Sequence, residues 1–338
     1  MRSYSCTVFL ALLAASTTTG HPLVSSPANI SCPIIFDGRV PSSLSLTDFD
    51  ASGAGSPFGP DYVKGAGLEW SDILLFPSVP SSRFDNAAAD GSAGGFKPVE
   101  VTLSDKSIFQ SQRGFRRAGL QFNGDPNTGS PGYVGVKTLH WSVRQDAARP
   151  MNLSHEYLVR TFVSFPLAFF ALHQQWETNE KTGEKKAQWR LTPSGYEQQN
   201  VWHEASDYSA DQIMFEAGTI LGQTGLPRSN FKIFDRGMKQ LWSTPIDATE
   251  WQNFAATLDL DKNTVRIYYS KGDAPLAAVT GALSADLSGG GQFQIGMLKK
   301  PTGTSDVVNS GYQESGIKEG QIYGGLFVED STNGCISL

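Results

Sequence analysis

Apolar and polar side chains alternate along much of the chain, and this period of two predicts β-strands. The alternation is clear in residues 139–143, 254–260 and 265–269. Residues 259–263, Asp-Leu-Asp-Lys-Asn, have the composition of a turn between the last two runs. No long stretch beyond the N-terminal region has the spacing of an amphipathic helix. Parallel strands need crossover connections, usually helical, so the pattern favours an all-β fold, an antiparallel β-sandwich.

The composition agrees with a turn-rich β protein and argues against one class of partner. Gly accounts for 35 of the 338 residues, above the average share of roughly 7%. Asp and Glu number 33 against 27 Lys and Arg, a formal charge of −6. Proteins that bind nucleic acids neutralise phosphates with clustered basic residues, so we expect no nucleic-acid partner. No repeat or linker divides the chain, and a single domain is expected over residues 21–338.

Residues 1–20 have the parts of a secretory signal peptide. Arg2 supplies a positive charge, residues 7–15 are an apolar run, and residues 16–20 are small. An apolar run this short cannot cross a hydrocarbon core of about 30 Å, so no membrane anchor is expected. The mature protein is therefore expected to be secreted and extracellular.

The cysteines and two sequons fit an extracellular protein. Cys6 leaves with the signal peptide, so Cys32 and Cys335 are the two cysteines of the mature chain, one near each end. In an oxidising compartment they are expected to form a disulfide. Asn29 and Asn152 begin Asn-x-Ser triplets and are candidate glycosylation sites.

Residues 158–198 differ in character from the sequence around them. A largely apolar run, 158–172, is followed by a strongly charged stretch. If the segment is removed, Tyr157 joins Gln199 and the joined text reads as one strand. Two interpretations stay open: a natural surface insertion, or translated intervening sequence that is absent from the mature protein. We expect the segment to leave the sandwich as a loop or loosely packed helix, with the strand resuming near Gln199.

Many short blocks, in order, carry a resemblance to a known family. They are residues 36–41, 56–65, 105–109, 114–118, 135–140, 152–157, 251–254, 286–289, 298–303, 310–316 and 322–325. With 158–198 set aside, the chain from about Ile34 to Cys335 resembles glycoside hydrolase family 131, a group of secreted fungal β-glucanases. The resemblance implies a β-jelly-roll with an open cleft on its concave face. It also implies hydrolysis of β-1,3-, β-1,6- and β-1,4-linked glucans.

Cleavage of a glycosidic bond needs two carboxyl groups, one protonated and one ionised. Glu156 is the first candidate, because the Ser-His-Glu-Tyr block at 154–157 looks like the block that carries a catalytic glutamate in the family. In the strand formed by joining Tyr157 to Gln199, alternation would put Glu156 and His203 on one face. A solvated glutamate at a strand end is the alternative for Glu156.

The second carboxylate is where this sequence departs from the family. Family members read Gly-Phe-Arg-Arg-Ala-Glu-Leu, and this chain has Gly119 in the place of the glutamate. A glycine neither donates nor accepts a proton, and loss of such a group typically removes about 10²-fold to 10⁴-fold of rate. Three readings stay open: a weak or inactive glucan-binding descendant, a carboxylate from elsewhere, or an error at this codon. Glu314, Glu204 and Glu216 are the substitutes to examine.

Candidates for substrate binding lie near the two catalytic positions. Arg116 and Arg117 precede Gly119 and are candidates to hold a carboxylate or a sugar hydroxyl; a surface ion pair is the alternative. His155 and His203 belong to the strand segment of Glu156. Tyr312 lies in a Gly-rich polar loop, where an aromatic ring is suited to stack on a sugar.

The remaining chemistry gives no support to metal or nucleophile catalysis. The sequence has five histidines but no His-Glu-x-x-His motif and no Gly-x-Ser-x-Gly motif. We therefore expect no metal and no other cofactor, a β-glucan polysaccharide or oligosaccharide as partner, and a monomer. The rival class is a catalytically silent glucan-binding or lectin-like protein.

Overall fold

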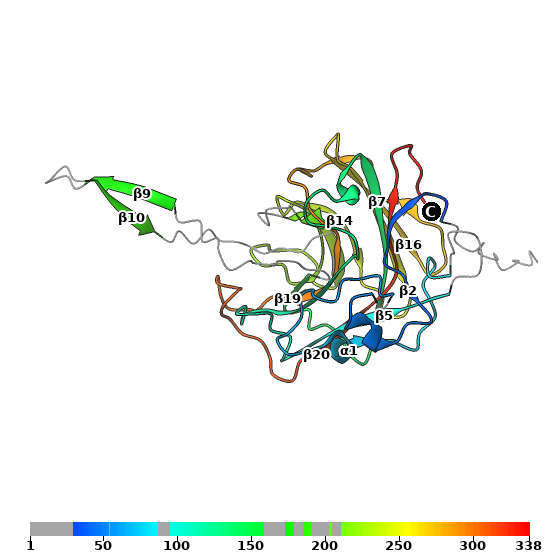
Figure 1. The fold of residues 1–338 in the computed structure, drawn as a ribbon, viewed down its shortest axis with the longest axis horizontal. Helices are drawn as coiled ribbons and strands as arrows, with labels where there is room; N and C mark the ends of the chain where they lie inside the picture. Colours follow the sequence, from blue (N-terminus) through cyan, green and yellow to red (C-terminus); the bar gives the residue numbers. More distant parts are fainter. Residues whose placement is uncertain are drawn as a thin grey trace, which may run out of the picture.

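The computed structural model describes residues 30–53, 55–86, 95–158, 173–178, 185–190, 203–204 and 211–338. They form two large antiparallel β-sheets that share one core, with little helix (Figure 1). The expected all-β antiparallel sandwich is confirmed. The expected signal peptide, residues 1–20, and the sequon residue Asn29 lie outside the described residues.

One sheet has nine strands, in the order β17-β16-β15-β7-β20-β5-β3, with β1 beside β20 and β18 beside β16. Its strands are β1 (Ile34–Asp37), β3 (Leu74–Leu75), β5 (Val99–Ser104), β7 (Val136–Gln145), β15 (Gln252–Asp259), β16 (Thr264–Lys271), β17 (Ala277–Ala278), β18 (Leu283–Ser284) and β20 (Lys318–Asp330). The alternating runs found in the sequence are the central strands β7, β15 and β16.

The other sheet has seven strands, in the order β14-β13-β12-β8-β19-β6, with β11 beside β12. Its strands are β6 (Arg116–Gln121), β8 (Glu156–Leu158), β11 (His203–Glu204), β12 (Asp211–Gly218), β13 (Asn230–Asp235), β14 (Gln240–Pro245) and β19 (Gln294–Lys299). This sheet carries Glu156 and Gly119.

Short elements complete the described part of the fold. They are the 3₁₀ turns η1 (Leu46–Phe49) and η2 (Pro131–Tyr133), the helix α1 (Trp70–Ile73), the pair β2 (Val40–Pro41) and β4 (Phe96–Lys97), and the pair β9 (His173–Thr178) and β10 (Lys185–Arg190). None of the helices in the described ranges is long and apolar enough to span a membrane.

The core between the two sheets is rich in aromatic side chains. Trp141 on β7 is fully buried and stacks on Phe254 of β15, with 5.1 Å between ring centroids. Phe215, from β12 of the other sheet, meets Phe254 edge-on at 4.8 Å. Edge-on and stacked aromatic pairs each add about 0.5–1.5 kcal/mol beyond the burial of their area. Contacts of this kind hold the seven-stranded sheet against the nine-stranded one.

The two ends of the described chain are joined covalently. Cys32 and Cys335 form a disulfide with 5.8 Å between their Cα atoms, which confirms the expected pairing. Beside it, the backbone N–H of Ser31 donates to Ser337 Oγ at 3.0 Å. The bond lies next to β1 and β20, which pair with each other.

One strand position of the seven-stranded sheet is filled by two separate pieces of chain. Leu158 of β8 pairs with Glu216 of β12, and His203 of β11 pairs with Ile213 of the same strand. Both pieces lie on the same side of β12, so residues 159–202 interrupt what is otherwise a single strand. The expectation of an interrupted strand agrees with this register.

The conformation expected for the interrupting segment was only partly right. Its described residues are the strands β9 and β10, which pair antiparallel with each other from Lys185↔Thr178 to Arg190↔His173. Figure 1 draws this hairpin away from the two large sheets. In these described residues paired strands stand where a loop or loosely packed helix was expected, and the backbone groups of the two strands satisfy one another.

Candidate functional site

Glu156 lies on the face of the seven-stranded sheet that is turned away from the core, which we call the outer face. Its neighbour Tyr157 points into the core, and side chains alternate along a strand. The Glu156 carboxylate forms an ion pair with Lys300 Nζ and accepts a hydrogen bond from the backbone N–H of Leu221. The side chain is 1% exposed. The carboxylate is thus held in place by a fixed charge and has almost no exposed surface in this structure.

A second carboxyl group, Glu216, lies beside Glu156 on the outer face. Glu216 pairs with Leu158, two residues along β8 from Glu156. It is 0% exposed, and neither of its carboxyl oxygens has a hydrogen-bond partner in the described part of the chain. Burial, together with the nearby charge of Glu156, raises the pKa of Glu216 well above its usual value. These surroundings favour a protonated Glu216.

Basic groups surround the two carboxyls. Burial disfavours the charged form of Lys300, but the charges of Glu156 and Glu216 outweigh it and raise the pKa of this lysine. Lys232 of β13 pairs with Glu216 in the ladder and donates to the carbonyl oxygen of Gly218 at 3.0 Å. Burial lowers the pKa of Lys232 to about 8. Each carboxyl therefore has a lysine close by, and Lys300 is the one that holds Glu156.

Asp211, at the start of β12, belongs to the same charged cluster. It is almost fully buried, and burial raises its pKa well above the usual value. Lys300 lowers that pKa and Glu216 raises it, so both groups lie within electrostatic range of Asp211. The outer face thus brings together three carboxyls and two lysines from β8, β12, β13 and the end of β19.

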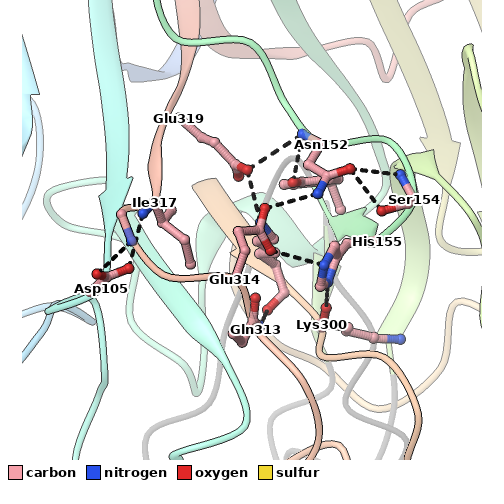
Figure 2. Close-up of polar contacts among 12 residues, drawn as sticks. Asp105, Asn152, Ser154, His155, Lys300, Gln313, Glu314, Ile317 and Glu319 are labelled. Carbon is pink, nitrogen blue, oxygen red and sulfur yellow. Dashed lines mark hydrogen bonds and ion pairs between the residues drawn. The ribbon is translucent and has the colours of Figure 1, made fainter.

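Glu314 lies in a separate polar network shown in Figure 2. Its carboxylate accepts from Lys299 Nζ and from Asn152 Nδ2, the latter at 2.9 Å, and lies 3.0 Å from His155 Nε2. Partial burial works against ionisation, but the hydrogen bonds from Lys299 and Asn152 hold the pKa of Glu314 at about 2. Glu314 is therefore an ionised anchor for its neighbours and a poor proton donor.

His155 connects this network to the backbone next to Lys300. Its Nδ1 lies 2.8 Å from the carbonyl oxygen of Lys300, while Nε2 faces Glu314. The ring thus bridges a backbone carbonyl and a carboxylate. His155 is 1% exposed, so it positions the chain around Glu156 and is closed to a substrate in this structure.

Gly119 lies on β6 with its hydrogen atoms where the outer face would carry a side chain, because Ala118 and Leu120 point into the core. Its ladder partner on β19 is also a glycine, Gly296. Its backbone N–H donates to the carbonyl oxygen of Val63 at 2.9 Å. The second catalytic glutamate was expected at this position on the outer face. Instead, Gly119 and its partner Gly296 both lack a side chain there.

The two arginines before Gly119 have different surroundings. Arg117 is fully buried and donates to Gln112 Oε1 at 2.6 Å, so a surface ion pair does not describe it. Arg116 is half-buried and donates to the carbonyl oxygens of Arg113 and Phe115 at 2.9 and 2.8 Å. Among the described contacts both arginines support backbone and side chains around β6.

Tyr312 and Asn152 are the exposed candidates near this network. The Tyr312 side chain is 63% exposed, and its ring stacks on His155 with 6.4 Å between centroids. An exposed aromatic ring over a buried polar network is suited to contact a sugar. Asn152 is also exposed, as a glycosylation site must be, although its amide donates to Glu314.

The expected alignment of His203 with Glu156 is wrong. Glu156 pairs with Gly218 and His203 pairs with Ile213, an odd number of positions apart on β12. The register therefore assigns the two positions to opposite faces of the sheet. If Tyr157 is joined directly to Gln199, four residues lie between Tyr157 and His203, but β12 has only three residues between their partners Ala217 and Ile213. The extra residue shifts the alternation by one, and this places His203 on the wrong face. The Glu204 side chain lies outside what the structure describes.

Sequence reasoning missed Lys300 and Asp211. Lys300 follows the last residue of β19, next to a second lysine, and only the pairing of β8 with β19 brings it to Glu156. Lys300 lies two residues after Leu298, so alternation along the strand would place its side chain on the outer face. This was the only clue to Lys300 in the sequence, and it is weak. In the described part of the chain, no group of three or more His, Cys, Asp or Glu side chains has the arrangement of a metal site.

Comparisons with known proteins identify the class of domain. A family model described as "Glycoside hydrolase 131 catalytic N-terminal domain" matches residues 34–195 and 185–334. A β-glucanase catalytic domain of this family from Podospora anserina is 18% identical, with a TM-score of 0.60, over 90% of this chain and 97% of that one. The corresponding catalytic domain from Coprinopsis cinerea is 19% identical, with a TM-score of 0.57, over 88% and 94%. No curated protein matches the sequence.

Proposed function

The chain belongs to glycoside hydrolase family 131, and from this premise we propose that it hydrolyses β-glucans, with β-1,3-, β-1,6- and β-1,4-linked chains as the substrate class. The observation that carries the proposal is the pair of carboxyls on the outer face, Glu156 and Glu216. Glu156 is paired with Lys300, and Glu216 has a raised pKa. One ionised and one protonated carboxyl are what glycosidic cleavage needs.

The environments of the two glutamates assign their roles. Glu216, held protonated by burial and by the charge of Glu156, gives its proton to the leaving glycosidic oxygen. Glu156, whose carboxylate forms the ion pair with Lys300, takes a proton from the attacking water or attacks the sugar carbon itself. Glu314 is a poorer proton donor, because its pKa is held at about 2. Glu216 thus supplies the carboxyl that Gly119 lacks.

A catalytically silent glucan-binding protein is the second candidate, and two observations favour it. Gly119 removes the glutamate expected from the family resemblance. In addition, the side chains of Glu156 and Glu216 are 1% and 0% exposed, so a glucan has no direct path to them in this structure. In this reading Tyr312 and the surrounding loops retain contact with the sugar while turnover is lost.

The two candidates are separated by measuring reducing-sugar release from a β-1,3/1,6-glucan and from a β-1,4-glucan, with binding isotherms on the same polymers. The hydrolase predicts activity in the unmodified protein and its loss in Glu156→Gln, with glucan binding retained. Glu216→Gln should lower the rate by about 10²-fold to 10⁴-fold. Glu250→Gln, at an exposed glutamate away from both carboxyls, is the control and should keep its activity. Glucan binding without any sugar release would establish the silent alternative.

We also propose that the protein acts outside the cell as a monomer, after removal of residues 1–20. The apolar run at 7–15 and the disulfide between Cys32 and Cys335 support an oxidising, secretory route. N-terminal sequencing of secreted material should begin at or near residue 21. Material that begins at Met1 would refute the signal peptide, and a dimer mass in solution would refute the monomer.

A further inference from the structure

A cavity of about 560 Å³ lies at the end of β6, away from Glu156. Its lining includes Tyr62, Gln121, Asn123, Asn127 and Gln292. This volume is in the range of sites for small ligands, roughly 300–1,000 Å³. Gln121 follows Gly119 by two residues on β6, so its side chain belongs to the same outer face.

A hydrogen-bonded set of neutral side chains forms one wall of the cavity. Gln292 Nε2 donates to the phenolic oxygen of Tyr62 at 2.6 Å, and Gln294 Nε2 donates to the same oxygen at 2.8 Å. Gln121 Nε2 donates to Gln292 Oε1 and, at 2.5 Å, to the backbone carbonyl of Asp125. These bonds hold amide and phenol groups in fixed positions before any ligand arrives, which lowers the entropy lost on binding.

The charge of the lining selects the class of ligand. Among the described residues that line the cavity there is no Lys, Arg or His. The one carboxylate, Asp125, is buried and accepts from Ser130 Oγ at 2.5 Å and from the backbone N–H of Phe293 at 2.7 Å. An anionic ligand would lose its hydration without gaining an opposite charge, and the carboxylate that could face a cation is already engaged by Ser130 and Phe293. A neutral ligand with many hydroxyl groups, a sugar, can bond to the amides and the phenol.

The register places the cavity at a distance from the carboxyl pair. Gln121 pairs with Gln294 on β19, whereas Tyr157, next to Glu156, pairs with Lys299 on the same strand. The two pairings are five positions apart on β19, which corresponds to about 17 Å along the strand. A sugar in the cavity is therefore not the unit being cleaved, but it can be a more distant unit of the same chain.

We propose that this cavity is a remote subsite that binds one neutral sugar unit of a long β-glucan whose scissile bond lies at Glu156. The inference rests on the proposed function for the identity of the polymer. The location of the subsite and the side chains that form it do not depend on turnover, and binding affinity alone tests both.

The test measures the affinity of a soluble long-chain β-glucan by calorimetry in a Glu156→Gln background. Gln121→Ala removes an amide of the wall, and Asn123→Ala removes an exposed amide of the rim. Each loss of a hydrogen bond of about 1 kcal/mol corresponds to roughly fivefold weaker binding. Asn86→Ala is the matched control, because Asn86 is an exposed amide that lines a different cavity.

Weaker binding in Gln121→Ala and Asn123→Ala, with the Asn86→Ala affinity unchanged, would support the subsite. Equal affinity in all variants, or no glucan binding in the Glu156→Gln parent, would overturn it. If Gln121→Ala fails to fold, Asn123→Ala alone decides. Lack of hydrolysis in the unmodified protein, together with weaker binding in the cavity variants, would refute the hydrolase and support the subsite.

Discussion

Leu158 and His203 pair with the same side of β12, opposite Glu216 and Ile213, although residues 159–202 separate them in the sequence. The two residues of β12 between these pairings would be matched by two residues of a continuous strand. The sheet therefore has room for a strand that passes from β8 into β11 directly. The segment between them is not needed to fill a strand position in the described sheet.

Removal of the interrupting segment should preserve the fold. Deletion of residues 159–200 leaves Val201 and Trp202 to pair with Phe215 and Met214, whereas deletion of 158–198 leaves one residue too many. We expect both variants to be secreted in higher yield than the full chain, because an apolar run at 162–172 is lost. The 159–200 deletion should have the higher melting temperature, since the other needs a bulge. Failure of both deletions to fold, beside a stable full chain, would show that the segment packs as part of the domain.

Restoring the missing carboxylate tests whether Gly119 limits the rate. Gly119→Glu places a carboxyl on the outer face, opposite Gly296, which has no side chain to oppose it. If the rest of the site is competent, hydrolysis should rise by about 10²-fold to 10⁴-fold. Gly119→Gln has nearly the same shape without the charge and should give no increase. Equal rates for the glutamate and glutamine variants would mean that Glu216 already serves, or that the protein is a long-diverged binder.

Glu314 should make the stability of the protein sensitive to acid. Its pKa is about 2 in the folded protein and about 4.3 when unfolded. A carboxyl with a depressed pKa stabilises the fold above its unfolded value, and this contribution is lost as the pH falls from about 5 towards 2. Glu314→Gln should lower the free energy of unfolding by on the order of 1–3 kcal/mol at pH 7 and by much less at pH 2.

Chemical denaturation across this pH range measures the effect. Glu250→Gln serves as the control, because Glu250 is exposed on the surface, away from this network. A Glu314→Gln curve parallel to that of the unmodified protein at every pH would contradict the assigned role of the Lys299 and Asn152 hydrogen bonds.

Loss of the disulfide should lower stability without changing the site. Cys32 and Cys335 are 303 residues apart, so closing this loop removes much of the freedom of the unfolded chain. The entropy model gives an upper value of about 5 kcal/mol. Cys335→Ser should therefore melt at a lower temperature, while sugar release well below that temperature is retained. Cys6→Ser should show no shift in the mature protein, and intact mass should find no free thiol in unmodified secreted material.

The parts of the fold that follow from local pattern were predictable, and the site was not. The strands β7, β15 and β16 have one face in the core and polar neighbours, so alternation revealed them. Strand β12 is buried along its whole length and has no such alternation. The place of Glu216 beside Glu156 depends on the pairing of β12 with β8, a contact between distant segments that no local pattern records.

The error at His203 has the same origin in register. The period of a strand is two, so a miscount of one residue in the joined text exchanged the faces. The count depends on where the interrupting segment begins and ends, and the pairings of Leu158 and His203 are what define it. Glu156 itself was found because its block of sequence resembles a family block, and not because its surroundings were visible in the sequence.

The disulfide between Cys32 and Cys335 also closes residues 32–335 into a covalent ring. A protease that cuts the backbone once, at any point between these two residues, opens the ring but releases no fragment. Such a cut within 159–202 would leave Glu156 and Glu216 on separate polypeptides that are still joined through the sulfurs. A nicked molecule would migrate as a single chain until a reducing agent separated it into two.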